Sequence, residues 1–236
     1  MAKDVIIALD FESGTAALSF LEKFGHRRPY VKVGMELFYA EGPGLVRTLK
    51  NRGHKVFVDL KLHDIPNTVK GGMRSLSVLG ADMVNLHASG GSVMMKAAIE
   101  GLTRADGSRP MLIAVTQLTS TSEELMQKEL LISENLENTV ISYAKNAASS
   151  GLDGIVCSPL ESEKVKSACG EGFITVTPGI RFADSAKDDQ SRITTPEKAR
   201  EQGSDYIVVG RPITASNDPH GAYERCMNEF LGGEQI

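Results

Sequence analysis

The sequence predicts an α/β protein of the (β/α)8 TIM-barrel class, and three observations support this prediction. Short runs rich in valine and isoleucine alternate with longer stretches of helical spacing, which is the pattern of a parallel sheet. Eight such units in 236 residues match the length of a barrel. No Gly-x-Gly-x-x-Gly motif follows the first strand-like run, which disfavours the alternative, an open doubly wound sheet. We therefore predict a single barrel domain over residues 1–236.

The predicted strands are short apolar runs that recur along the whole chain. They cover residues 5–10, 30–36, 55–62, 83–88, 111–119, 154–158, 174–180 and 206–213. Helical spacing lies between them, for example over 15–24, 69–80, 138–151 and 196–203.

Two segments depart from this alternation. An additional helix is predicted over 122–131, because the serine and threonine residues before it can cap its first turn. The stretch 181–195 is polar, lacks apolar periodicity and follows the seventh strand, so it is a candidate lid. The alternative is a surface loop without a function.

Composition limits the classes of function. The net charge of −4 provides no basic surface for nucleic acid. The sequence has no apolar run near the roughly 18 residues of a membrane span, and its first residues lack the features of a secretory signal. Cys157, Cys169 and Cys226 form no Cys-x-x-Cys pair, so we expect free thiols and a reducing, cytoplasmic location.

Charged residues interrupt the third predicted strand in "VFVDLKLHDIPNTV", residues 56–69. Side chains alternate along a strand, which separates an aliphatic set from a second set that contains the charges. The aliphatic set is Val56, Val58, Leu60 and Leu62, and the second is Phe57, Asp59, Lys61 and His63. We expect the second set to face the barrel axis, with its charges at the carboxyl end of the strand, where barrel active sites are built.

The spacing of Asp59, Lys61 and Asp64 suggests that Lys61 is a proton donor. Nearby carboxylates favour the protonated form of a lysine, which suits Lys61 to donate a proton to a carbanion. Two alternatives remain open: an ion network that only holds the barrel rim, or a metal site formed by Asp59, Asp64 and Glu36. We interpret His63 as a structural histidine rather than an acid or base.

The ends of other predicted strands add polar residues at the same rim. They are Asp10, Lys32, Thr119, Gly210 and Arg211. Loops after strands seven and eight of such barrels often bind phosphate. The backbone N–H groups near Gly210 and the guanidinium of Arg211 suit this role, as do Arg181 and Gln190 in the polar stretch. The alternative for Arg181 and Gln190 is that they are solvated loop residues.

The segment "DLKLHDIPNT", residues 59–68, resembles the signature of the orotidine 5'-phosphate decarboxylase family. Further segments are similar to the short bacterial form of that family: "ALD" at 8–10, "KVG" at 32–34, "VTQLTS" at 115–120, "TPGIR" at 177–181 and "VVGRPIT" at 208–214. The resemblance implies a homodimeric barrel that converts orotidine 5'-monophosphate to UMP in de novo pyrimidine synthesis. It also implies that neither a metal nor an organic cofactor is needed.

The resemblance implies a role for each matching residue. Lys61 would protonate C6 of the pyrimidine, with Asp59 beside the departing carboxylate and Lys32 completing the charge array. Asp64 and Thr68 would come from the partner subunit. Asp10 and Lys32 would bind the ribose, and Thr119 the pyrimidine edge. The phosphate would bind Arg181, Gln190, Gly210 and Arg211. The rest of the signature, Leu60, Leu62, His63, Ile65, Pro66 and Asn67, would contribute to substrate binding.

Two alternatives to this function remain. Sugar-phosphate enzymes that resemble 3-keto-L-gulonate 6-phosphate decarboxylase and hexulose phosphate synthase share an Asp-x-Lys-x-x-Asp array and use Mg²⁺. Here "IPNT" after the array, with the "VTQLTS" and "TPGIR" segments, favours the pyrimidine enzyme. A non-catalytic phosphosugar-binding barrel would be expected to lose Lys61 or Asp59, and both are present.

Overall fold

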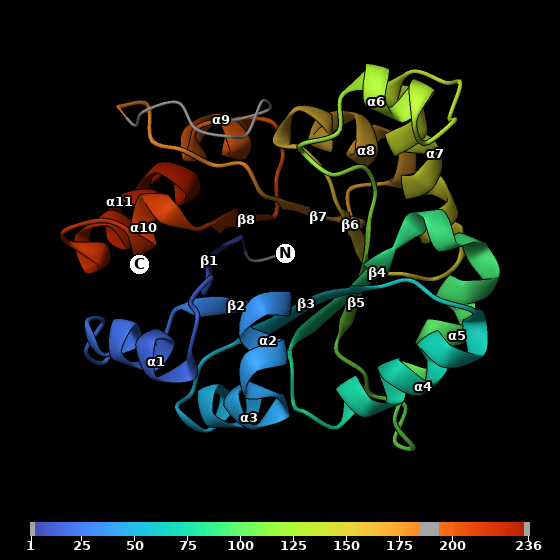
Figure 1. Ribbon diagram of the computed structural model, residues 1–236. Coiled ribbons are helices and arrows are strands. Elements are labelled where there is room, and N and C mark those ends of the chain that lie inside the picture. The colour runs from blue at the N-terminus through green and yellow to red at the C-terminus, as the bar shows by residue number, and fades with distance from the viewer. Residues whose placement is uncertain (1–2, 185–193, 234–236) are drawn as a thin grey trace.

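The computed structural model describes residues 3–184 and 194–233 and confirms the predicted barrel. Eight parallel strands pair in chain order, and β1 (Asp4–Ala8) closes the ring by pairing with β8 (Tyr206–Val209). The remaining strands are β2 (Tyr30–Gly34), β3 (Val56–Leu62), β4 (Met83–His87), β5 (Met111–Val115), β6 (Gly154–Val156) and β7 (Ile174–Thr177). Figure 1 shows the strands at the centre and the helices around them.

Helices form most of the connections between strands. They are α1 (Gly14–Glu22), α2 (Met35–Glu41), α3 (Pro43–Asn51), α4 (Pro66–Ser77), α5 (Gly91–Leu102), α6 (Glu123–Lys128), α7 (Leu136–Ser149), α8 (Ser162–Cys169), α9 (Pro196–Glu201), α10 (Arg211–Thr214) and α11 (Pro219–Leu231). Two short 3₁₀ turns cover Ala88–Gly90 and Pro159–Glu161. The additional helix is α6, and the Ser122 hydroxyl caps it by accepting from the Leu125 N–H at 3.1 Å. Within the described ranges, no helix is both long and apolar enough to cross a membrane.

The alternation predicted for the third strand is confirmed by two separate hydrophobic clusters. Val56 and Val58 belong to a large cluster that includes helix residues, and Leu60 and Leu62 pack against it. Phe57 belongs to a smaller cluster of inward-facing strand residues. The inward set of β3 therefore continues from an apolar barrel core to Asp59 and Lys61 at the carboxyl end of the strand. The inward position predicted for His63 is wrong, because β3 ends at Leu62 and His63 is exposed.

Several predicted strands are too long at their carboxyl ends. Met35 begins helix α2, so Glu36 lies on an exposed helical turn and not on a strand. Strand β8 ends at Val209, and α10 begins at Arg211 with Pro212 in its first turn, a position that suits proline. Strand β5 ends before Thr119. The polar residues at these positions are therefore presented by turns above the barrel.

The two ends of the polar stretch 181–195 are joined, although residues 185–193 lie outside the described part of the chain. Ile180 forms a parallel bridge with Thr194. The N–H of Arg181 donates to the Thr194 carbonyl at 2.9 Å, and the Thr194 N–H donates to the Gly179 carbonyl at 3.0 Å. All three cysteines are free thiols, as predicted.

Candidate active site

A cavity of about 300 Å³ lies at the carboxyl ends of the strands. Its apolar lining comes from inward-facing residues, chiefly Phe57, Val115, Val156, Val176 and Val208. Its charged lining comes from Lys32, Asp59 and Lys61, and Thr119 also faces it. An apolar chamber with a few convergent polar groups is the usual form of a small-molecule site.

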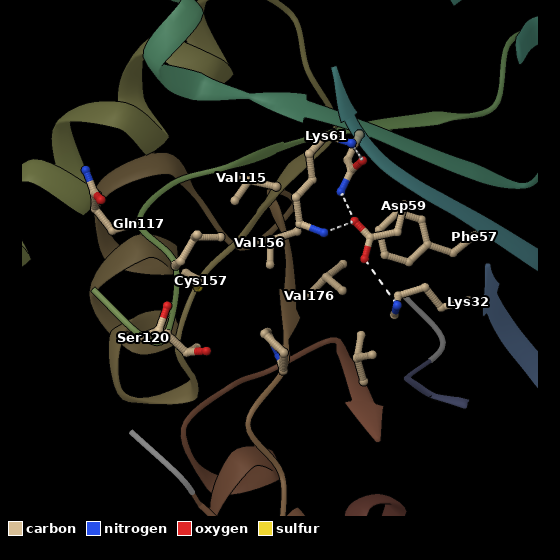
Figure 2. Close-up of a pocket in the computed structure, with 15 residues that line it drawn as sticks. Lys32, Phe57, Asp59, Lys61, Val115, Gln117, Ser120, Val156, Cys157 and Val176 are labelled. Atoms are coloured by element: carbon tan, nitrogen blue, oxygen red, sulfur yellow. Dashed lines mark hydrogen bonds and ion pairs between the residues drawn. The ribbon is translucent and has the colours of Figure 1, made fainter. Parts of the chain in front are cut away.

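A row of alternating charges runs along one side of this cavity. The Lys61 ammonium donates to Asp59 Oδ1 at 2.7 Å, and Asp59 Oδ2 lies 3.4 Å from the Lys32 ammonium. Lys32 also donates to Asp10 Oδ1 at 3.2 Å. Figure 2 shows the Asp59 carboxylate joined by dashed lines to both lysines. The structure thus brings together Lys32 of β2, Asp59 and Lys61 of β3, and Asp10 of the segment that follows β1.

The lysines determine the ionisation of Asp59. Burial alone would raise the pKa of this carboxyl group. The ammonium groups of Lys32 and Lys61, with hydrogen bonds from Lys61 and Asn85, outweigh burial and hold the pKa below its usual range. Asp59 is therefore an anion at neutral pH, fixed between two cations.

The glycine at the end of β2 lies close to two charged side chains. A Cβ atom at Gly34 would lie 3.1 Å from the Lys32 ammonium and 3.5 Å from Asp10 Oδ1. Such a contact is tighter than side chains normally accept, so the missing side chain leaves room for the Asp10–Lys32 pair.

Among the residues of this cavity that sequence reasoning missed is Asn85 on β4, which contacts the charge row. Its side chain donates to Asp59 Oδ1 at 2.7 Å and accepts from the Lys61 N–H at 2.8 Å. The signal was present, because Asn85 is a polar residue within an apolar run and is in phase with the inward-facing Met83.

A second, smaller cavity of about 200 Å³ shares Lys32, Pro178 and Val208 with the first. Ala8, Asp10, Gly179, Arg181, Gly210 and Arg211 complete its lining. Arg181 is nearly buried, and its guanidinium donates to the Ile180 carbonyl at 2.8 Å. Two arginines and a lysine around one small chamber suit an anionic group such as a phosphate. Gln190 lies outside the described residues.

Residues 63–68, the end of the signature segment, do not contribute to these cavities. None of His63, Asp64, Ile65, Pro66, Asn67 and Thr68 lines either of these two cavities. Most of them are exposed, including the apolar Ile65 at 68%. The Asp64 carboxylate accepts from the Ile65 N–H at 2.6 Å. The substrate roles predicted for these residues and for Leu60 and Leu62 stay predictions.

Two further expectations concern histidine and metal. The His63 ring centroid lies 5.7 Å from that of His87, and burial, with the neighbouring His63 and Lys61, lowers the pKa of His87. Across residues 3–184 and 194–233, no three His, Cys, Asp or Glu side chains form a possible metal site. The alternative set of Asp59, Asp64 and Glu36 is thus not assembled within one chain.

Comparison with known proteins agrees with this geometry. A family model described as "Orotidine 5'-phosphate decarboxylase / HUMPS family" matches residues 3–226. Curated proteins named orotidine 5'-phosphate decarboxylase are similar over 98% of this chain: one from Geobacillus sp. is 53% identical, with 98% of its own length covered, and one from Bacillus cytotoxicus is 55% identical, with 99% covered. The crystal structure of orotidine 5'-phosphate decarboxylase from Lactobacillus acidophilus superposes with a TM-score of 0.86 at 45% identity, covering 97% of this chain and 99% of that one.

Proposed function

Because the chain belongs to the orotidine 5'-phosphate decarboxylase / HUMPS family, we propose that it removes CO2 from orotidine 5'-monophosphate to give UMP in pyrimidine synthesis. One observation carries the proposal: a row of Lys32, Asp59 and Lys61 lies where an apolar cavity meets a cavity with two arginines. That arrangement suits a substrate with a flat base at one end and a phosphate at the other.

The two cavities suggest how such a substrate lies. The pyrimidine occupies the apolar chamber, with Thr119 at its edge. The ribose hydroxyls meet Asp10 and Lys32, the pair that adjoins both chambers. The phosphate binds Arg181, Gly210 and Arg211, with Gln190 contributing from the polar stretch. Binding energy from the phosphate is then available to order the site around the distant reacting carbon.

The charge row explains the chemistry. When the C6–CO2 bond breaks, its electron pair stays on C6, and the ring offers no obvious π system to take it up. The Lys61 ammonium stabilises this carbanion electrostatically and then transfers a proton to C6. A fixed cation at that place costs no reorganisation during the reaction. Asp59 lies beside the substrate carboxylate and repels it, a ground-state effect that disappears as CO2 leaves.

We further propose that the enzyme is a homodimer in which Asp64 and Thr68 complete the partner's site. The exposure of the 63–68 segment and of the apolar side chain of Ile65 supports this arrangement. No step of the proposed reaction requires a metal or an organic cofactor. As a step of pyrimidine synthesis, it is expected in the cytoplasm.

The test is turnover of orotidine 5'-monophosphate, followed as the fall in pyrimidine absorbance, with and without EDTA. Decarboxylation that EDTA does not change supports both the substrate and the metal-free mechanism. A reaction that EDTA abolishes contradicts the metal-free mechanism. No reaction rejects the substrate, and sugar phosphates with Mg²⁺ are then assayed.

A further inference from the structure

The backbone of β3 is irregular at the proton-donating lysine. Lys61 has a φ of +52°, in the left-handed region that residues with a Cβ rarely adopt. The pairing of β3 with β4 also shifts there. Val58 pairs with Val84 and Leu62 pairs with Leu86. Asp59, Leu60 and Lys61 therefore face a single residue of β4, which is Asn85.

Asn85 occupies the place where regular strand pairing fails. A bulge leaves backbone groups without their usual ladder partners. Here the side chain supplies one, because Asn85 Oδ1 accepts from the Lys61 N–H at 2.8 Å. The other end of the same amide donates from Nδ2 to Asp59 Oδ1 at 2.7 Å. Asn85 is 1% exposed, so water does not compete for either bond.

The two bonds fix the orientation of the amide. One partner is an N–H, which can only donate, and the other is a carboxylate, which when ionised can only accept. A flipped amide would lose both bonds. Asn85 therefore joins the main chain of Lys61 to the carboxylate that binds the Lys61 ammonium, and it sets the position of the lysine at both ends.

We propose that Asn85 is a positioning residue for decarboxylation, which holds the bulge at Lys61 and aligns Asp59 so that the Lys61 ammonium points at the reacting carbon. This inference rests on the proposed function. Asn85 itself is not assigned a contact with the substrate. Its role is to hold the left-handed backbone of Lys61 and the Asp59 carboxylate in one geometry. Small displacements of a catalytic group from its productive position have large effects on rate.

An apolar residue at position 85 would not serve equally well. It would leave the part-buried Lys61 N–H without this acceptor and remove one of the two donors to Asp59 Oδ1. A buried polar group without a partner is costly, so the bulge would relax toward regular pairing and turn the Lys61 side chain. The hydrogen bond from Asn85 is also among the interactions that keep the Asp59 pKa low.

The first experiment separates positioning from general stability. In Asn85→Ala, kcat for orotidine 5'-monophosphate is expected to fall about 10- to 100-fold, because both hydrogen bonds of the amide are lost and the Lys61 ammonium shifts from its position. KM is expected to change less than about threefold, because no substrate contact is removed. Thr175→Val is the matched control, since Thr175 is fully buried on β7 and its hydroxyl bonds Asp205 and the Gly203 carbonyl. The control is expected to lose stability while kcat is retained.

The second experiment uses Asn85→Asp, which preserves shape. Its ionised form accepts from the Lys61 N–H but repels Asp59. Its protonated form restores an O–H donor to Asp59 Oδ1. The charged groups that contact position 85 are Asp59 and Lys61 of β3, and Lys32 lies on the other side of Asp59. On β4, His87 is the next residue on the same side of the strand. The β5 partner of position 85, Ile113, is apolar. The kcat of Asn85→Asp relative to wild type is expected to rise at least tenfold between pH 8 and pH 5.5.

Two failures are distinguishable. If the wild type does not decarboxylate orotidine 5'-monophosphate, the proposed function fails. If the wild type is active but Asn85→Ala keeps more than half of its kcat, or Asn85→Asp follows the wild-type pH profile, the positioning role is refuted. A crystal structure of Asn85→Ala gives a readout independent of activity. Unchanged left-handed φ and an unchanged Lys61–Asp59 contact would also refute the role.

Discussion

Replacing each of the two carboxylates that contact Lys32 tests how burial determines what the ion pairs of the charge row contribute to stability. Asp59 and Asp10 lie at similar distances from the same ammonium, 3.4 and 3.2 Å. Their side chains differ in exposure, 10% for Asp59 and 63% for Asp10. We predict that Asp59→Asn lowers the free energy of unfolding by about 3–5 kcal/mol, and that Asp10→Asn lowers it by at most about 1 kcal/mol.

The magnitude follows from the distances. At an effective dielectric constant of about 20, Coulomb's law gives an attraction of roughly 6 kcal/mol for Asp59 with Lys61 at 2.7 Å and roughly 5 kcal/mol with Lys32 at 3.4 Å. Desolvation of the ions opposes most of this attraction. Removing the anion leaves the cations of Lys32, 11% exposed, and Lys61, 25% exposed, without the carboxylate between them, and this uncompensated charge is what destabilises the variant. At Asp10, water and salt screen the same interaction.

The assay is urea unfolding of wild type, Asp59→Asn and Asp10→Asn at pH 7 and one protein concentration, because a dimer would make stability depend on concentration. With a slope of about 3 kcal/mol per molar urea, the Asp59→Asn midpoint should fall by roughly 1 M or more. Raising the salt concentration should reduce the Asp10 effect more than the Asp59 effect. Equal, small losses in the two variants would refute the argument from burial.

Three further predictions concern the site, and a fourth concerns the buried His54. Lys61→Ala should lower kcat at least about a thousandfold while binding of UMP largely survives, and retention of most of kcat would exclude Lys61 as the proton donor. Arg211→Ala should lower kcat/KM roughly 10- to 150-fold, chiefly through KM, and an unchanged KM would contradict the phosphate role. Mixing Lys61→Ala and Asp64→Asn subunits under exchange conditions should restore activity, because one site of each hybrid dimer has both residues; a mixture as inactive as its components would argue against a shared site. Burial lowers the pKa of His54 below its ordinary 6.5. The unfolded chain therefore binds a proton more readily than the folded chain, and the free energy of unfolding should fall as the pH drops from 7 toward 5. His54→Gln should flatten this pH dependence in unfolding measurements, and an unaltered slope would contradict the assignment.

The barrel was predictable because its signals are local. The inward and outward sets of β3 follow from strict alternation, and the outer hydrophobic cluster confirms the aliphatic set at Val56 and Val58. Strand ends were harder to predict, because the predicted run at 206–213 extends past Val209, where the strand stops. There, Pro212 and the turn at Gly210 start a helix. Periodicity does not detect such a change.

The site was predictable in its charges and not in its backbone. Asp59, Lys61 and Lys32 could be placed on one rim because each falls on the inward phase of its strand. The bulge could not be predicted, because it depends on how two strands pair. Three residues of β3 lie opposite the single residue Asn85 of β4. Asn85 itself was visible as a polar residue in an apolar strand, but its partners depend on that pairing. The exposed 63–68 segment likewise gains its proposed role only from a second subunit.

The bulge at Lys61 limits how far the Asp-x-Lys motif can be moved between proteins. Copying "DLKLHD" onto another barrel would transfer the side chains without the main-chain geometry that orients them. Next to a regularly paired strand, the transferred segment would form no bulge, and the lysine would then lie at a different height in the barrel. A transplant would need a matching amide on the next strand, so the smallest portable unit of this chemistry is a pair of strands.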